Sequence, residues 1–330
     1  MRARDAVVEF VGSKSGIEND LVPREGYTLH ALPLKGFAGN PIAQARASLL
    51  SLRAILRCRR IIQCLEPRAV LGVGGYASAP AVVAARTLGV PTFLHEQNSV
   101  PGRLNRVASR FTAETLVTFP EAERSLRRAV RIGMPTRADI FRASREEGLR
   151  SLGLEPPVVL VFGGSGGALR INLAAAEAFG GATTYTVVQV SGRRDFSRLS
   201  TQNRRHHILE YVDGLRLYLA AADVVVSRAG AGSLFDIAAA GKAAILIPFP
   251  YATGDHQLYN ARYFTEKGAA ELMPDAEVAA GPLRRRVEDL LEDGERRERM
   301  ARRIGALATP DAAGHVADRL LRAGDEGWGP

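Results

Sequence analysis

Two runs of small residues in the second half of the chain each stand between an apolar segment and a helical one. The first lies in VLVFGGSGGALRIN, residues 159–172, where glycines and Ser165 follow the apolar run. A turn of this kind gathers backbone N–H groups and the positive end of a helix dipole, and both favour an anion such as phosphate. Its spacing matches neither the G-x-G-x-x-G dinucleotide pattern nor the P-loop, which needs G-K-[ST]. A tight strand-to-helix turn without a ligand is the alternative interpretation.

The second run lies in SRAGAGSLFDIAAAGKAAILIPFP, residues 227–250. Residues 230–233 offer main-chain donors to a diphosphate, and Asp236 stands one turn into the helix, where a carboxylate can accept hydrogen bonds from a ribose diol. Two such turns in one half of the chain favour a nucleotide. In the alternative interpretation, Asp236 only stabilises the N-terminus of its helix.

The elements around these turns predict an α/β fold. Apolar, β-branched runs predict strands in the first half at 6–12, 27–34, 69–75, 90–97 and 114–119, and in the second half at 157–164, 183–190, 206–212, 223–230 and 243–250. Continuously apolar strands that alternate with helical segments are typical of parallel sheets covered on both faces. The sequence therefore predicts two α/β halves, each with a parallel sheet.

A chain of 330 residues with 46% hydrophobic content can form two domains, each with its own core. The charged segment 142–157 is the predicted boundary, which gives an N-terminal domain at 1–150 and a C-terminal domain at 151–330. The last helix could pack back on the N-terminal domain.

Composition also bounds the setting of the protein. The two cysteines, Cys58 and Cys64, form neither a disulfide framework nor a metal-ligand spacing, so a reducing, cytoplasmic compartment is expected. No segment resembles a signal peptide. The uncharged stretch 69–85 is interrupted by glycines and Pro80, and it is better explained as strand, turn and helix than as a membrane span.

Positive charge is concentrated in the first half. Residues 1–150 hold 23 of the 44 lysines and arginines but only 13 of the 35 acidic residues, and so account for the whole net charge of +9. This asymmetry favours an anionic partner: nucleic acid, an acidic membrane surface or a phosphorylated substrate. Segment 45–65, ARASLLSLRAILRCRRIIQCL, has the composition of a helix that binds anionic headgroups. Alternatively, the basic surface is only solvated and half of the leucines of this segment cover the sheet.

Six segments together resemble the MurG family of glycosyltransferases. They are GGSGGALRIN, SRAGAGSLFDIAAAG and PYATGDHQLYNARYFTEKGAA in the second half, and LGVGGYASAP, LHEQNSVPGRLNR and IGMPTR in the first. The resemblance runs from about Phe10 to the last helix. It implies the two-domain glycosyltransferase-B (GT-B) fold, in which two Rossmann-like domains with parallel sheets face a cleft.

The resemblance also implies a reaction. Members of the family transfer N-acetylglucosamine from UDP-N-acetylglucosamine to the C4 hydroxyl of undecaprenyl-diphosphate-linked N-acetylmuramyl-pentapeptide, which converts lipid I to lipid II in peptidoglycan synthesis. The expected partners are this UDP-sugar, the polyprenyl-diphosphate-linked muramyl peptide and the anionic inner membrane surface, with no nucleic acid. The expected location is the cytoplasmic side of the cell membrane, with peripheral attachment. No D-x-D pair stands near the donor loops, so no metal and no cofactor are expected.

The substrate-binding residues implied by the resemblance are Asn98, Arg137, Ser165, Val212, Ala231, Gly232, Ser233, Leu234, Phe235, Asp236, His256 and Gln257. Ser165 would lie against the diphosphate and Arg137 would pair with a phosphate of the leaving UDP. The backbone at 211–212 would meet the uracil, while 231–236 would cradle the diphosphate and hold the ribose.

The remaining residues of this set would bind the sugar. His256 and Gln257 would bond its hydroxyls, and Asn98 would reach the N-acetylglucosamine from the other domain. Each residue has a simpler interpretation: Asn98 as a turn residue, Arg137 as a surface cation, and His95 as a histidine satisfied in the core. His95 is the only nearby histidine that could act as the catalytic base.

Three features depart from the family pattern. The family usually carries glutamate where Asp236 stands and glutamine where Gly166 stands. The family also begins with a strand, a G-G-T-G-G-H loop and a helix, whereas this sequence starts at what would be the second strand. Either the start is internal to a longer gene product, which we favour, or the chain is a shortened relative. A shortened chain could be a catalytically silent UDP-sugar-binding protein; a transferase for another lipid acceptor is a further alternative.

Overall fold

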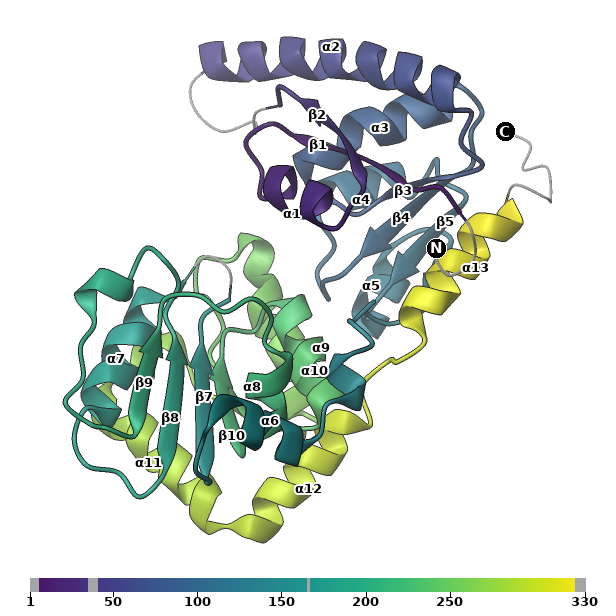
Figure 1. Cartoon of the computed structure of the whole chain (residues 1–330). Coiled ribbons are helices and arrows are strands. Elements are labelled where there is room, and N and C mark those ends of the chain that lie inside the picture. The colour runs from purple at the N-terminus through teal and green to yellow at the C-terminus, as the bar shows by residue number, and fades with distance from the viewer. Residues whose placement is uncertain (1–5, 35–40, 165–166, 324–330) are drawn as a thin grey trace. The chain divides into compact units, whose positions relative to one another are not determined.

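The computed structural model describes residues 6–34, 41–164 and 167–323, with side chains in the second helix from residue 47 onward. Contacts divide the chain into two compact units: residues 1–132 with 313–330, and residues 133–312 (Figure 1). We call these unit 1 and unit 2. By this division, segment 133–150 belongs to unit 2, and the last helix, α13 (Ala312–Ala323), lies almost wholly in unit 1.

Unit 2 is built on a six-stranded parallel sheet in the order β12-β11-β10-β7-β8-β9, counted over the described residues. The strands are β7 (Val158–Phe162), β8 (Thr186–Val190), β9 (His206–Leu209), β10 (Val224–Ser227), β11 (Ala243–Leu246) and β12 (Glu271–Leu272). Every pair in the sheet is parallel. The carboxyl ends of β7 and β10 therefore lie at the same edge, where ligands bind in open α/β sheets.

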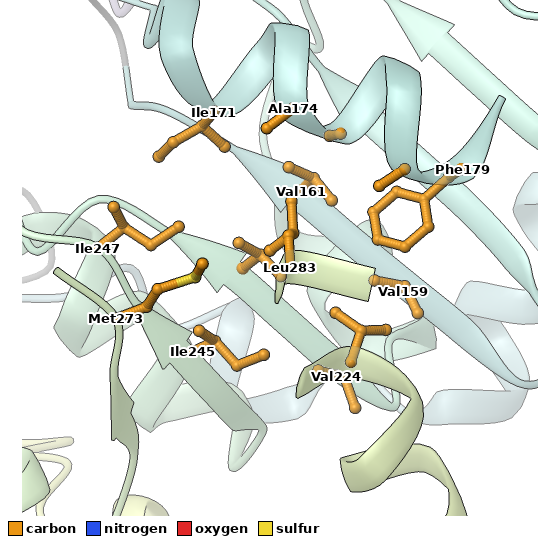
Figure 2. Packing of buried hydrophobic residues seen from close by; sticks show 14 of the residues in the cluster. Val159, Val161, Ile171, Ala174, Phe179, Val224, Ile245, Ile247, Met273 and Leu283 are labelled. Carbon is orange, nitrogen blue, oxygen red and sulfur yellow. The ribbon is translucent and has the colours of Figure 1, made fainter. Parts of the chain in front are cut away.

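The helices of unit 2 are α6 (Arg145–Leu152), α7 (Leu169–Phe179), α8 (Arg216–Ala221), α9 (Ala231–Ala240), α10 (His256–Thr265), α11 (Ala280–Glu292) and α12 (Gly294–Gly305). Short 3-10 helices are η2 (Ile140–Arg142), η3 (Phe196–Arg198), η4 (Thr253–Asp255) and η5 (Asp275–Glu277). Figure 2 shows α7 residues such as Ile171 and Phe179 packed over Val159 and Val161, with Leu283 of α11 in the same cluster. All five residues of β7 are buried, because helices cover both faces of the sheet.

Unit 1 holds two separate parallel sheets among its described residues. One consists of β1 (Glu9–Ser13) and β2 (Thr28–Leu32). The other has the order β3-β4-β5-β6, with β3 (Val70–Gly72), β4 (Thr92–Glu96), β5 (Glu114–Val117) and β6 (Ala129–Arg131). The helices are α1 (Glu18–Arg24), α2 (Pro41–Leu65), α3 (Gly75–Thr87), α4 (Arg103–Ala108), α5 (Pro120–Ser125) and α13. Helix α3 contacts both β1 and β3, so one helix serves both sheets.

The predicted strands are present, and they pair in parallel as predicted. The structure shortens most of them at one or both ends and adds two strands that the sequence analysis missed, β6 and β12. These have three and two residues, too few to form a recognisable apolar pattern. In unit 1, α13 packs Val316 and Leu320 against Phe93 of β4 and Leu116 of β5.

Candidate active site

A cavity of about 500 Å³ in unit 2 brings together residues that the sequence analysis assigned to the leaving UDP. It is lined by Arg137, Tyr211, Val212 and Gly214, among others. Arg137 precedes η2, and the other three follow β9 in the sequence. The predicted phosphate-binding and uracil-binding groups therefore share one cavity.

Arg137 lies against a turn whose backbone conformation favours glycine. Gly214 has φ of +97°, and a Cβ atom built there would stand 2.9 Å from the Arg137 Nη2 atom. The Arg137 Nε atom is 3.9 Å from a carboxylate oxygen of Asp139, and the arginine side chain is 62% exposed. Because the guanidinium is this exposed, its planar pair of N–H groups is accessible to a phosphate.

Helix α9 begins directly after Gly230, and the described part of the chain supplies no side-chain cap to its N-terminus. The N–H groups of its first turn are the donors that an anion would use. Leu234 and Phe235 are 0% and 2% exposed, and the Phe235 ring packs edge-on against Phe264. Any contact that these two residues make with a ligand must therefore come from their main chain.

Asp236 is partly buried in α9, and burial raises the pKa of its carboxyl from 3.8 to about 6. The guanidinium of Arg137 opposes this rise in pKa and the charge of Asp139 reinforces it, so all three groups lie within electrostatic range of one another. The predicted phosphate and ribose contacts are thus close together in unit 2.

His256 and Gln257 begin α10. The His256 Nδ1 atom is 2.9 Å from the Thr253 carbonyl oxygen, which can only accept, so Nδ1 carries the proton and Nε2 of the neutral ring is an acceptor. The Gln257 Oε1 atom accepts from the Phe249 N–H at 3.0 Å, which leaves its amide nitrogen as the donor. The pair can offer one acceptor and one donor to sugar hydroxyls.

Ser165 and Gly166 lie outside the described residues, so the role of Ser165 stays a prediction. Close to them, Gly167 has φ of +72°, and a Cβ there would stand 3.1 Å from a carboxylate oxygen of Asp195. Glycine is therefore favoured at this position of the first small-residue run.

In unit 1, Asn98 lies in the turn that follows β4, and its N–H donates to the Glu96 Oε1 atom at 3.0 Å. His95 is 7% exposed, with its Nε2 atom 3.5 Å from the Thr118 hydroxyl. This is the environment of a core histidine, and its role as the base stays a prediction.

Two features of unit 1 were missed as site candidates. Glu96 is a buried carboxylate whose only sequence signal was an acidic residue at the end of an apolar strand. Gly74 and Gly75 have φ of +88° and +72° and lead into α3, whose N-terminus has no side-chain cap in the described structure. Two consecutive positive-φ glycines at a helix N-terminus are a signal of a turn suited to anions.

Profiles of known families match most of the chain. The glycosyltransferase family 28 N-terminal domain matches residues 1–117, and the C-terminal domain of that family matches residues 158–316. A protein of Rubrobacter xylanophilus is 65% identical over 332 residues, covering 100% of this chain and 99% of the relative. One of Halothermothrix orenii is 34% identical, covering 94% and 89%. Both are named UDP-N-acetylglucosamine–N-acetylmuramyl-(pentapeptide) pyrophosphoryl-undecaprenol N-acetylglucosamine transferase.

The chain belongs to the MurG family. The crystal structure of Acinetobacter baumannii MurG matches it with a TM-score of 0.76 at 26% identity, covering 97% of this chain and 92% of that one. A UDP-N-acetylglucosamine 2-epimerase from Neisseria meningitidis, solved with UDP-N-acetylglucosamine bound, matches with a TM-score of 0.62 at 15% identity, covering 83% and 81%, and supports the fold alone. The predicted GT-B architecture is confirmed.

A long helix, α2, follows β2, and its apolar residues differ in exposure. Leu49, Leu52 and Leu56 of α2 are each at least half exposed, whereas Ala54 and Cys58 pack into the core of unit 1. The apolar residues of the segment thus divide between an exposed face and the core, where Ile55 packs against the cluster that contains Leu32 of β2. Within the described ranges, no helix is both long and apolar enough to span a bilayer, and no group of three or more potential metal ligands occurs.

Proposed function

We propose that this chain transfers N-acetylglucosamine from UDP-N-acetylglucosamine to the C4 hydroxyl of the N-acetylmuramyl-pentapeptide carried on undecaprenyl diphosphate. The sugar is transferred with inversion, so lipid I becomes the β-1,4-linked lipid II of peptidoglycan synthesis. The observation that carries the proposal is the grouping of Arg137, Asp236 and the 211–214 turn. It occurs in a chain 65% identical over its whole length to a relative named for this reaction.

In the proposed reaction, the acceptor C4 oxygen forms a bond to the anomeric carbon while the bond from that carbon to the diphosphate breaks. Negative charge grows on the departing UDP, and preorganised donors stabilise such charge without reorganisation. Arg137 and the N–H groups at the start of α9 take this role. The hydroxyl proton passes to a base, for which His95 is the candidate from the sequence.

The sugar is held by hydroxyl contacts in the proposed complex. The His256 Nε2 atom accepts from one hydroxyl and the Gln257 amide donates to another, which is consistent with the bonds that fix their other polar atoms. Asn98 contributes a further contact to the sugar. Asp236 accepts from the ribose diol, and Ser165 lies against the diphosphate.

The acceptor also carries a diphosphate, and we assign it to the turn at Gly74–Gly75. Support comes from the positive φ of both glycines and from the uncapped start of α3, a helix of 13 residues. The Asn105 side chain lies beside this turn, 3.5 Å from where a Gly74 Cβ would stand. Its Oδ1 atom is buried with no partner among the described residues.

Peripheral attachment to the cytoplasmic face of the membrane belongs to the same proposal. Leu56, one of the exposed leucines of α2, lines a groove together with Arg53, Arg57 and Arg60. Arg59 of α2 donates to the Thr87 hydroxyl at the end of α3. Next to Thr87 a smaller pocket begins, lined by Arg86, Arg110, Arg128 and the 59% exposed Phe111. Arginines interspersed with exposed apolar side chains are the composition that binds an anionic lipid surface.

Transfer of radiolabelled sugar tests the proposal. The purified chain is incubated with labelled UDP-N-acetylglucosamine and a short-chain lipid I analogue, and a labelled disaccharide lipid is the expected product. Saturable UDP-sugar binding without product would instead identify a silent binding protein. Product formed only with another polyprenyl-linked acceptor would replace lipid I by that acceptor.

A further inference from the structure

The turn that carries Asn98 is folded around a buried carboxylate. Glu96 is the last residue of β4 and is 3% exposed. It accepts three hydrogen bonds: from the Asn98 N–H at 3.0 Å, from the Gly102 N–H at 2.9 Å and from the Asn105 side-chain amide at 2.8 Å. The first goes to Oε1 and the other two to Oε2. One side chain therefore fixes both ends of the 97–102 segment.

Asn105 connects this carboxylate to the neighbouring helix. It lies on α4, is 2% exposed, and its amide nitrogen is also 3.4 Å from the His95 carbonyl oxygen. The main chain of Glu96 is held independently, because the Thr118 N–H donates to its carbonyl at 3.0 Å. With strand and helix both anchored, the carboxylate determines the path of the turn between them.

The bonding of Glu96 argues against a direct part in proton transfer. A general base needs a lone pair that faces the attacking hydroxyl. Both carboxylate oxygens of Glu96 already accept bonds from groups of its own loop and helix, and the side chain is almost wholly enclosed.

We propose that Glu96, with Asn105, is a positioning residue of the transferase, whose carboxylate holds the main chain at 97–102 so that Asn98 is presented to the transferred sugar. The inference rests on the proposed function for the role of Asn98. The hydrogen-bonding that it requires is independent of that function and can be measured without substrate.

Glu96→Gln is the sharpest change, since it keeps the shape and removes the charge. A glutamine replaces one acceptor oxygen by an NH₂ group, so a donor would face one of the three donors around it. The bonds that remain lose their charge assistance. The matched control is Glu121→Gln, at an exposed glutamate in the first turn of α5.

Amide hydrogen exchange on the full chain without substrate is the first measurement. Exchange at Asn98 and Gly102 is expected to be at least about tenfold faster in Glu96→Gln than in the unmodified chain, because protection depends on the local bond. Glu121→Gln should leave both amides unchanged. Equal exchange in all three proteins would overturn the proposal. If the glutamine variant does not fold, Asn105→Ala, which removes one of the three donors, is expected to give a smaller change in the same direction.

Kinetics distinguish positioning from catalysis. For Glu96→Gln, kcat/KM for UDP-N-acetylglucosamine should fall by roughly tenfold to a hundredfold, as for a substrate contact displaced by about 1 Å, with the pH dependence of kcat/KM unchanged. Loss of one limb of the pH profile would make Glu96 the base and overturn the proposal. An unmodified chain that gives no product defeats the proposed function instead, and the exchange measurement still tests the role of Glu96 in the turn.

Discussion

Asp236 has the electrostatic property that most clearly links one residue to ligand binding. Its carboxyl is held at a pKa of about 6 by burial, and ribose hydroxyls bind the ionised form better than the protonated form. UDP-N-acetylglucosamine should therefore bind more tightly as pH rises through about 6 and reach a plateau above about 7. Calorimetry between pH 5 and 8 checks this, and Asp236→Asn should flatten the profile. A slope that survives in the asparagine variant would place the titrating group elsewhere.

The raised pKa of Asp236 should also affect the stability of the fold, which is expected to fall as pH rises, whereas ligand binding is expected to strengthen. Because the folded chain raises the pKa of Asp236 from 3.8 to about 6, its contribution to stability is complete below pH 3.8 and is lost as pH rises through about 6. The loss amounts to about 3 kcal/mol at neutral pH. Asp236→Asn should raise the free energy of unfolding at pH 7.5 by up to that amount and change it little at pH 4. Urea denaturation at the two pH values measures this, with the exposed Asp311→Asn as control.

Arg137 provides a test of geometry rather than charge. Arg137→Lys keeps the positive charge but loses the planar pair of donors, so kcat/KM should fall roughly tenfold to a hundredfold. Steady-state kinetics with UDP-N-acetylglucosamine give the value. Arg142→Lys, at an exposed arginine of η2, is the matched control and should have near-normal kinetics. A normal rate for Arg137→Lys would mean that the guanidinium meets no phosphate.

At the scale of single residues, the sequence predicted well which residues are close together. It predicted less well which contacts their side chains make. Asp236, Arg137 and Val212 were expected around one ligand, and they are indeed close together in unit 2. The motif did not reveal that the side chains of Leu234 and Phe235 are buried in the core. A residue that contacts a ligand through its main chain and a residue whose side chain is buried can both be apolar, so the residue type does not distinguish them. The three bonds of Glu96 depend on backbone groups that no residue pattern specifies.

At the scale of elements, continuous apolar runs identified the long parallel strands, because strands buried on both faces need no polar alternation. The short β6 and β12 escaped, since two or three residues show no period. Among the described residues β1–β2 form a sheet separate from β3–β6, whereas the sequence analysis predicted one parallel sheet in this half and noted that the first strand of the family pattern is not in this sequence.

Helix α2 gives the prediction that belongs to this scale. Leu52 and Leu56 are 56% and 54% exposed, and the double change Leu52→Ser with Leu56→Ser should weaken binding to anionic vesicles at least tenfold, because two apolar side chains no longer enter the lipid surface. Vesicle flotation at low salt is the measurement. Leu173→Ser, at an exposed leucine of unit 2, is the control. Undiminished flotation of the double variant would exclude α2 as the attachment site.

At the scale of the whole molecule, charge and chemistry divide between the halves. The first 150 residues carry all of the net positive charge, which favours the anionic partner that we propose for this half. Unit 2 supplies the grouping of Arg137, Asp236 and the 211–214 turn. The sequence alone indicated the difference in charge between the halves, because net charge can be counted without a structure. The contact between α13 and the β4–β5 face of unit 1 joins residues 200 or more positions apart. Composition does not indicate such a contact, and the sequence analysis gave it only as a possible packing of the last helix on the N-terminal domain.

The central claim is that unit 2 binds the diphosphate and ribose of a uridine-linked sugar. Isothermal titration calorimetry of UDP-N-acetylglucosamine into the full chain at pH 7.5 tests it most directly, at two temperatures so that a small enthalpy at one of them does not hide binding. The account predicts saturable one-to-one binding that weakens at least tenfold in Arg137→Lys. A well-folded chain that gives no heat at either temperature, with UDP-N-acetylglucosamine or with UDP, would contradict it.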